Sequence, residues 1–423
     1  MGETQRNTRP YYTLEFYIDD LDLSLQLNSI SIITSMKAVY QTVVVNFEID
    51  AKDFILEQIY GQKHAKVIIT MMTEDNRPGE VTELDLFIVK DNIPLSKKEN
   101  SQQPDHPQSD PIKFITIIRD SSKFMNTTIN KLFSNTSPKT PLDAVKAIYD
   151  DYIGEESQIE NDNANQESIY QMIIPPMTFN RAINYIDGYF GIYNGPMFKY
   201  CHYDKKFYMW DLSKKITKPE EYTVYILARG TPDKEIMEEV GSDDSSFYTH
   251  STLQSHYKSN KNIIKNSFKQ RIVAKPIDSL FKNIDIDMDD IFKNNSILDG
   301  RPDIKYDEIV KERYQYHSKN IMGYEGTEDF ARAFFSRKMS TTSDFSFTLH
   351  RNITLNKLTR IGIPIKIIPQ VQEYMGYQGK YIASSSIVTF SRGEQQHWVA
   401  RAKIDCLRGN LEYSDSNSTG FTT

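Results

Sequence analysis

Alternation of apolar and polar residues near the N-terminus constrains this fold most. Residues 12–19, Tyr-Thr-Leu-Glu-Phe-Tyr-Ile-Asp, change character at every step, and residues 43–50 repeat the pattern. A period of two is typical of a strand with one buried face. Further strands are predicted at residues 66–72, 83–90 and 112–119. Because free strand edges aggregate, we predict that these strands close into a small antiparallel β-barrel.

A middle region mixes helices with strands. Thr140-Pro141-Leu142-Asp143 predicts a helix start, with a capping threonine, proline at the first position and an acid three residues after the cap. A second helix is predicted after Thr178, ending near Gly188–191, and a hairpin follows at 198–212.

The C-terminal part returns to strands. After a predicted strand at 221–229 and a short helix behind Thr327, four strand-like segments follow, at 345–352, 363–368, 380–391 and 396–407. The polar stretch 96–111 is predicted to be an exposed loop, and the tail from Ser414 to be disordered.

The length of 423 residues exceeds what one hydrophobic core supports, about 250–300 residues. The predicted fold class is mainly β with α+β insertions. The predicted domains are a first β-barrel (1–120), a mixed α/β domain (121–218) and a connecting region that completes a second barrel (219–325). C-terminal barrel strands (326–412) and a disordered tail (413–423) follow.

Composition favours large interfaces over nucleic-acid binding. Aromatic residues make up 12% of the chain, and aromatic side chains supply much of the buried area of interfaces. The net charge is −7, from 50 basic and 57 acidic residues, whereas a dedicated DNA binder carries a basic surplus. This charge suits a passage through which DNA slides without sticking.

Cysteine content and hydropathy bear on the compartment. Two cysteines, Cys201 and Cys406, are too few for a disulfide framework, so both are expected to be reduced, part-buried thiols. The N-terminus has no apolar signal core, and no stretch approaches the roughly 18 apolar residues of a membrane span. We therefore predict that the chain does not insert into a membrane. We also predict that it assembles in a reducing cytoplasm.

Two charged stretches could bind a ligand. Residues 285–290 place carboxylates at alternate positions, but they lack the glycine that a calcium loop needs, so we favour an extended segment with an acidic edge. Residues 256–275 interleave lysines and one arginine with aromatic residues, which suits either a DNA backbone or an acidic partner.

No catalytic, cofactor-binding or metal-binding residues are predicted, and we expect no enzyme activity. The eight histidines show no metal-ligand spacing. Cys201 and His202 are neighbours on a predicted strand, so their side chains should point to opposite faces. No nucleophile elbow, phosphate loop or dinucleotide motif occurs. Two convergent carboxylates for glycoside cleavage stay an open alternative.

The order of parts resembles the central hub proteins of T-even-type phage baseplates, a family related to the hub domains of type VI secretion spikes. Three patterns carry the likeness, over about half of the chain. They are the strand-rich N-terminal domain before helix 141–152, the run 173–179 leading to a helix and an aromatic hairpin ending in Met209-Trp210-Asp211, and strands within 355–369 and 379–408. Residues 96–111 and 229–325 depart from the pattern, so contacts made there are not carried over.

The resemblance implies two tail-tube-like barrels per subunit, the first in 1–120 and the second combining 221–229 with the strands after Phe345. A homotrimer would then form a ring of six barrels, matching a six-fold tail tube to a three-fold puncturing spike. The implied partners are the spike, a tube or tube-initiator protein and other baseplate proteins. DNA would pass through the channel without specific binding, in a virion tail baseplate assembled in the bacterial host cytoplasm.

Three other functions are compatible with the sequence. Another trimeric tail or secretion-spike hub would need the same fold. A receptor-binding or adhesion protein should carry aromatic and polar patches at an exposed tip. A carbohydrate hydrolase should hold two carboxylates with perturbed acidities in a pocket.

Overall fold

The computed structural model describes the chain in segments. The described residues are 11–36, 38–50, 59, 61–72, 77–92, 109–133, 140–154, 156–166, 172–193, 197–204, 206–211, 221–227, 245–250, 270–276, 284–287, 313–321, 345–349, 360–370, 378–393 and 397–408. For 270–276, 284–287, 313–321 and 345–349 only the backbone is described. The predicted helix after Thr327, the predicted disordered tail and nearly all of the predicted loop at 96–111 lie outside these residues.

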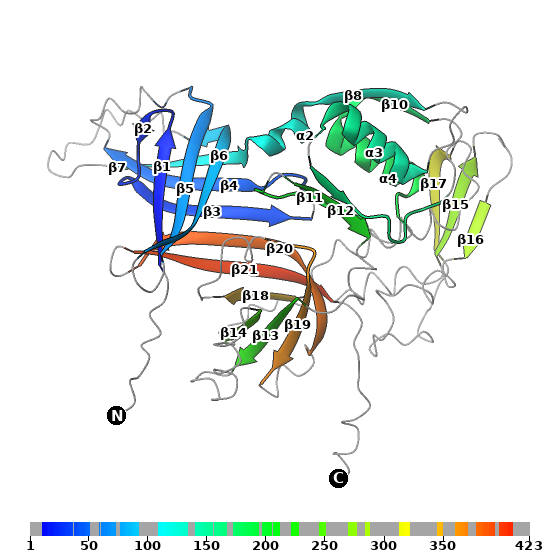
Figure 1. Ribbon diagram of the computed structural model, residues 1–423. Coiled ribbons are helices and arrows are strands. Elements are labelled where there is room, and N and C mark those ends of the chain that lie inside the picture. Colours follow the sequence, from blue (N-terminus) through cyan, green and yellow to red (C-terminus); the bar gives the residue numbers. More distant parts are fainter. Residues whose placement is uncertain are drawn as a thin grey trace, which may run out of the picture.

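Eight antiparallel strands close into a barrel (Figure 1). In order around the barrel they are β20 (Gly379–Arg392), β3 (Leu27–Ser35), β4 (Thr42–Asp50), β7 (Ser109–Ile118), β6 (Pro78–Asn92), β5 (His64–Met72), β1 (Tyr12–Ile18) and β21 (Trp398–Arg408), which pairs with β20 again. We predicted a first barrel within residues 1–120. Those residues supply six of the eight strands, and the β20–β21 hairpin from the far end of the chain supplies the other two.

The predicted alternation determines which side chains face the interior of the barrel. Along β1 the burial pattern alternates, so every second side chain is buried. Phe16, Phe47 and Phe114 are buried at the centre, with ring centroids 5.3 Å apart between Phe16 and Phe47 and 5.1 Å apart between Phe47 and Phe114. Contacting aromatic rings of this kind add to the free energy of area burial.

The β20–β21 hairpin also belongs to a second curved sheet. Its further strands are β19 (Pro364–Pro369), β13 (Tyr222–Leu227) and β14 (Ser246–His250) beyond β20, and β18 (Phe345–Leu349) beyond β21. The outermost strands, β14 and β18, contact each other, so the sheet curls on itself. As predicted, the strand within 221–229 joins those after Phe345. A second closed barrel stays a proposal, because no β14–β18 pairing occurs among the described residues.

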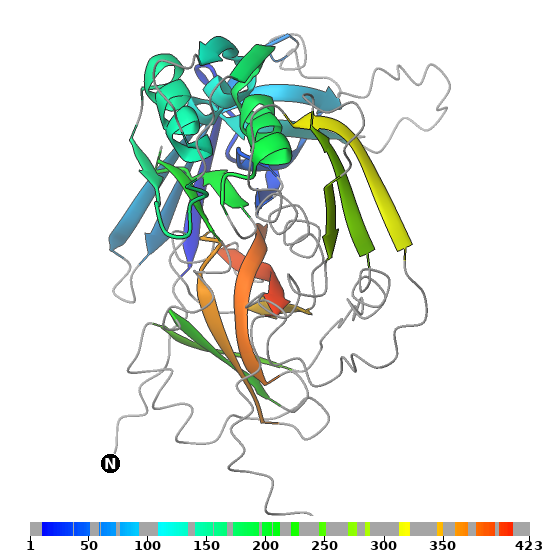
Figure 2. The same cartoon turned by 90° about the vertical axis from the view of Figure 1, so that its right-hand side faces the viewer.

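An α/β unit lies beside one end of the barrel (Figures 1 and 2). Its helices α3 (Pro141–Tyr152) and α4 (Phe179–Phe190) lie between the β8–β10 pair and the hairpin β11–β12. The bounds of these strands are Thr128–Phe133 for β8, Met172–Thr178 for β10, Met197–Cys201 for β11 and Phe207–Asp211 for β12, with β9 (Ser157–Ile159) parallel to β12. The structure confirms the capping box of Thr140 with Asp143 and the end of α4 at Gly191, whose φ is 68°.

A small sheet completes the described chain. It contains β15 (Gln270–Pro276), β16 (Ile284–Asp287) and β17 (Arg313–Ile321). Two short helices, η1 (Asp120–Ser122) and α2 (Lys123–Asn126), connect the barrel strand β7 to the α/β unit. The fold is therefore mainly β with α+β insertions, as the sequence predicted.

Candidate functional site

The described residues contain two kinds of feature that bear on function. One is the junction that fixes the α/β unit to the barrel. The other is the pair of outer barrel faces. The junction holds the α/β unit in place against the barrel. The outer faces are the barrel surfaces that are available for contact with another molecule.

Aromatic side chains of the β11–β12 hairpin build the junction. Phe198 and Trp210 stack with ring centroids 4.9 Å apart, and Tyr200 stacks on Tyr208 at 5.0 Å. These four rings form one buried cluster with Ile361 and Ile382, which come from the segment before β19 and from β20. The hairpin therefore packs directly on β20, one of the two strands that the barrel and the second sheet share.

Gly362 sits beneath this cluster in a conformation that favours glycine. Its φ is +75°, and a Cβ atom at this position would lie 2.6 Å from Cζ2 of Trp210 and 2.8 Å from Cε1 of Phe198. Its backbone N–H donates to the carbonyl of Ala383 at 2.7 Å, which ties the segment to β20. Both the backbone angle and the close ring contacts therefore require the absence of a side chain.

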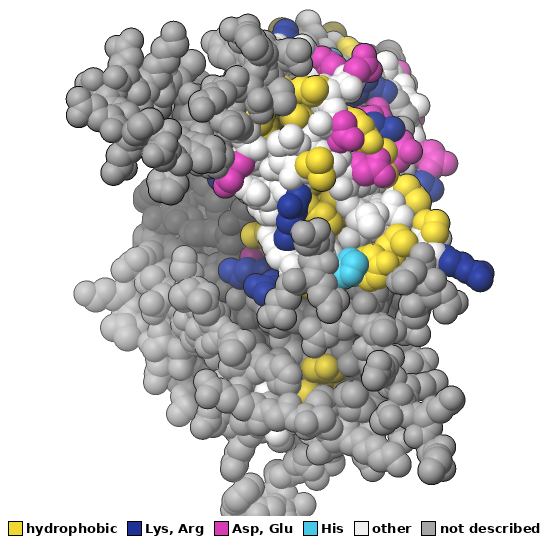
Figure 3. All heavy atoms as spheres, turned by 90° about the vertical axis from the view of Figure 1, so that its left-hand side faces the viewer, with side chains coloured by type: hydrophobic (Ala, Val, Ile, Leu, Met, Phe, Trp, Pro, Cys, Tyr) yellow, Lys and Arg dark blue, Asp and Glu magenta, His cyan; other side chains and the backbone are white. Residues whose placement is uncertain are grey.

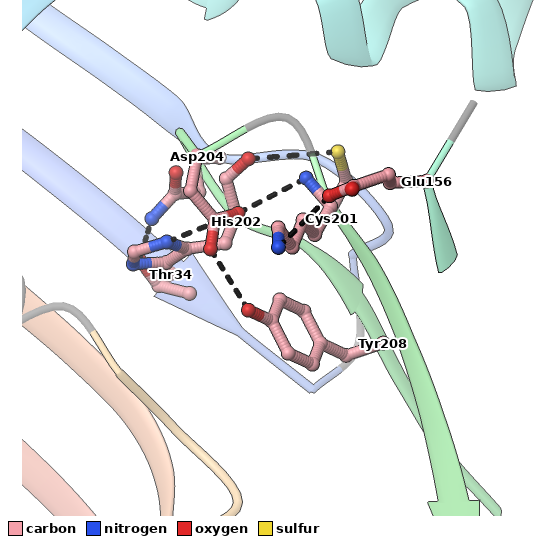
Figure 4. Close-up of polar contacts among 8 residues, drawn as sticks. Thr34, Glu156, Cys201, His202, Asp204 and Tyr208 are labelled. Carbon is pink, nitrogen blue, oxygen red and sulfur yellow. Dashed lines mark hydrogen bonds and ion pairs between the residues drawn. The ribbon is translucent and has the colours of Figure 1, made fainter. Parts of the chain in front are cut away.

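The turn of the hairpin is held by Asp204 (Figure 4). This carboxylate accepts hydrogen bonds from the Tyr208 hydroxyl at 2.8 Å and the Lys206 backbone N–H at 3.0 Å, and it lies 3.4 Å from Nδ1 of the buried His202. Burial alone would raise the pKa of Asp204, but the hydrogen bonds from His202, Lys206 and Tyr208 outweigh it and lower the pKa. Lys206 also pairs with Glu156 at 2.8 Å.

Cys201 and His202 do not form a nucleophile–base pair. The Cys201 thiol is buried in the core of the α/β unit and approaches the backbone carbonyl of His202 at 3.7 Å, not the imidazole (Figure 4). The imidazole is directed toward Asp204 instead. The strand predicted over both residues ends at Cys201, so His202 lies at the start of the turn. Cys406 is likewise a free, buried thiol, and burial raises its pKa.

We expect Asp204→Asn to lower the free energy of unfolding by about 1–3 kcal/mol at pH 7, because the hairpin turn loses charge-assisted hydrogen bonds. A lowered folded-state pKa means that the stabilisation is full above the unfolded-state pKa of about 3.9 and is lost as pH falls through the folded value. The difference between the variant and the original chain should therefore shrink below about pH 4.

Urea unfolding of both chains at pH 7, 5 and 3 measures this effect. Asp150→Asn, which changes an exposed carboxylate of α3, is the control and should stay within about 0.5 kcal/mol. An Asp204→Asn chain as stable as the original at pH 7 would show that the turn does not depend on this carboxylate.

One outer side of the barrel carries a group of exposed carboxylates on β1, β6, the short strand β2 (Leu21–Asp22), which pairs with β1, and the β1–β2 turn. This group is named here the acidic face and consists of Glu15, Asp19, Asp20, Asp22, Glu83 and Asp85. All six are exposed, and Lys66 of β5 lies among them, 2.7 Å from Glu83. The hydrogen bond with Glu83 and the charges of Glu83, Asp85 and Glu15 raise the pKa of Lys66. Acidic side chains gather on the upper part of the view in Figure 3.

The opposite side of the barrel is uncharged at its centre and is named here the hydroxyl face. Its outward residues on β3, β4 and β20 are Ser29, Ser31, Ile33, Val44, Asn46, Ile387, Thr389 and Ser391, all half-buried. The exposed Val399, Arg401 and Lys403 of β21 border it. In the eight-strand ring β3 and β5 are separated by three strands in either direction, so the two faces lie on opposite sides.

Side chains on the hydroxyl face bond to each other across the strands. Ser31 and Thr389 share a hydrogen bond of 3.0 Å between their hydroxyls, and the Asn46 amide donates to the Ser29 hydroxyl at 2.9 Å. Sequence analysis missed strand β3 altogether. Its outward serines, together with the adjacent Ile32 and Ile33, obscure the period of two, although Ile30 and Ile32 alternate with Ser29 and Ser31.

The other sequence candidates are only partly described. Asp285 and Asp287 lie on β16, opposite Val273 and Arg271 of β15, and the rest of the acidic stretch is outside the described residues. Of the basic stretch, only 270–275 is described, on β15. The part of the chain that the structure describes holds no group of three His, Cys, Asp or Glu side chains suited to a metal ion. Within the same residues, none of the helices has the length and apolar character that crossing a bilayer requires.

Comparison with solved structures relates this fold to tail proteins. The tail protein from Neisseria meningitidis MC58 superposes with a TM-score of 0.52 at 11% sequence identity, covering 93% of this chain and 96% of that one. The 43 kDa tail protein of prophage MuSo2 from Shewanella oneidensis gives 0.51 at 11%, covering 94% and 98%. No family model matches the chain, and no curated protein matches its sequence. The chain therefore shares its fold with these two tail proteins over nearly its whole length.

Proposed function

We propose that this protein is the structural hub of a contractile phage tail baseplate. It would form a homotrimeric ring that adapts the six-fold tail tube to a three-fold puncturing spike and leaves a channel for DNA. The observation that carries the proposal is the fold, which two tail proteins share over more than nine-tenths of this chain. Because fold alone does not fix function, the arrangement of the parts has to support the role as well.

The β units support the symmetry-matching part of the proposal. Each subunit has one closed barrel and one curled sheet joined by a common hairpin. Three subunits would bring six such units around one axis, which suits a partner with six-fold symmetry on one side and three-fold symmetry on the other. The junction of Phe198, Trp210 and Gly362 would hold the α/β unit in a fixed position beside this ring.

Charge supports the conduit part of the proposal. The chain has a net charge of −7, and acidic side chains cluster on the barrel surface. A polyanion in a channel whose wall carried such a negative charge would be repelled and would find few cations to bind. DNA would therefore pass without specific binding, and the proposed partners are the spike, a tube or tube-initiator protein and other baseplate proteins. Catalysis and cofactors have no part in the role, and the site of action is the virion tail baseplate after assembly in the host cytoplasm.

The solution mass of the purified chain tests the proposal. Light scattering after size exclusion, on the chain alone and mixed with tail spike and tube proteins of the same phage, should give a species with three copies of the 49.1 kDa chain. A chain that stays monomeric in every mixture would contradict the hub and shift weight to an adhesion role. A glycan-binding screen would then follow.

A further inference from the structure

We propose that the hydroxyl face is a docking surface for a different protein of the tail, one whose contact surface has an apolar centre and an acidic rim. The inference rests on the proposed function and names the chemistry of a partner. Three features of the face carry it: polar groups that already bond to each other, aliphatic side chains at the centre and cations on both borders.

Water can leave the centre of the face at little cost. The hydroxyls of Ser31 and Thr389 bond to each other at 3.0 Å, and the Asn46 amide donates to the Ser29 hydroxyl at 2.9 Å. A polar group that keeps its hydrogen bond when it is buried avoids most of the penalty of an unpaired buried group. The face can therefore become dry in a contact without a partner that matches each donor and acceptor.

Aliphatic side chains lie in the middle of the face. Ile33 of β3 is opposite Ile387 of β20, and Val44 of β4 is opposite Ile115 of β7. All four are half-buried, so covering them removes further apolar area from water. The charged backbone of a nucleic acid would gain nothing from covering these side chains, whereas the apolar centre of a protein surface would. This favours a protein as the occupant.

Exposed cations lie on both borders of the face. Arg401 and Lys403 are on β21, directly beside β20. On the other side, Lys113 of β7 and Lys90 of β6 lie beyond β4. All four side chains are exposed. A partner with carboxylates around an apolar centre would therefore meet an opposite charge on each border, and such complementarity speeds association and fixes the orientation of a complex.

The acidic face of a second copy carries such carboxylates but does not suit the proposed ring. It lies on the opposite side of the barrel, so copies joined through these two faces would extend as an open row. Such a row does not return to its first copy, as a ring of three must. The hydroxyl face is therefore left for a different protein.

Charge reversal on one border tests the face against defined partners. The chain and the spike, tube and other baseplate proteins of the same phage would be purified, and the binding of each to the chain would be measured by surface plasmon resonance at low and at physiological salt. For the protein that binds, Arg401→Glu with Lys403→Glu should slow association about 10-fold and reduce its salt dependence, because the reversed border repels an acidic rim.

A second variant removes apolar area from the centre. Ile33→Thr with Ile387→Thr keeps a β-branched residue on each strand and should speed dissociation about 10–100-fold, since each change replaces apolar atoms with a hydroxyl. The control, Lys63→Glu with Arg181→Glu, makes the same change of charge as the border variant at exposed positions before β5 and on α4. It should bind as the original chain does. Circular dichroism and thermal melting would verify that each variant is folded.

Slower association of the border variant and faster dissociation of the centre variant, with an unchanged control, support the inference. Folded variants that bind every tail protein as the original chain does overturn it and leave the proposed function standing. The same holds for variants that lose only binding to a short DNA duplex or only self-association. An original chain that binds none of the tail proteins overturns the proposed function itself.

Discussion

Gly362→Ala is expected to lower the free energy of unfolding by about 2–4 kcal/mol, an effect that combines a strained backbone with overpacking. The added Cβ would lie 2.6 Å from a ring carbon of Trp210, which is 4% exposed and stacked on Phe198. Neither ring can move away without disturbing the junction. Thermal and urea unfolding of the full chain measure the loss.

Gly61→Ala separates the two causes. Gly61 has a φ of +80°, but a Cβ there would have no atom within 4 Å, so only the backbone cost of about 1 kcal/mol should appear. A double variant with Trp210→Phe should recover part of the Gly362→Ala loss, because phenylalanine lacks the ring carbon that clashes. Equal losses at Gly362 and Gly61 would show that packing at the junction tolerates a side chain.

A fragment of residues 1–120 is expected not to fold, which is the largest effect that the structure predicts. The fragment lacks β20 and β21, so the free edges of β3 and β1 would leave the barrel open. Its inward side chains, Phe16 and Phe47 among them, would then be exposed to water. An open sheet with an exposed apolar face has neither the burial nor the edge protection that a stable domain needs.

Restoring the hairpin should restore the fold. The same fragment with residues 384–406 appended through a flexible glycine-serine linker regains the strands that pair with β3 and β1. We expect it to unfold cooperatively in urea and to show dispersed amide resonances, whereas the bare fragment shows neither. A bare fragment that unfolds cooperatively would contradict closure by the C-terminal hairpin.

Local features of the fold could be predicted from the sequence because local physics determines them. The start of α3 is determined within four residues. Thr140 caps the helix, Pro141 fixes φ at its first position, and Asp143 returns the hydrogen bond to the cap. The alternation in 12–18 likewise gives the inward and outward sides of β1.

Closure of the barrel could not be predicted in the same way. The pairing of β20 with β3 joins residues from opposite ends of the chain, and no local pattern records such a contact. Strand β3 was missed because Ser29 and Ser31 occupy outward positions that usually hold charged residues. The hydroxyl face became visible only when β20, β3 and β4 were side by side, since none of these strands defines it alone.

Electron cryomicroscopy of the assembled particle tests the central claim most directly. The purified chain, with its tail tube and spike proteins, should give a ring of three copies between tube and spike, with an open channel on the three-fold axis. A single copy at the periphery of the tail, or a ring whose axis is closed to duplex DNA, would contradict the hub.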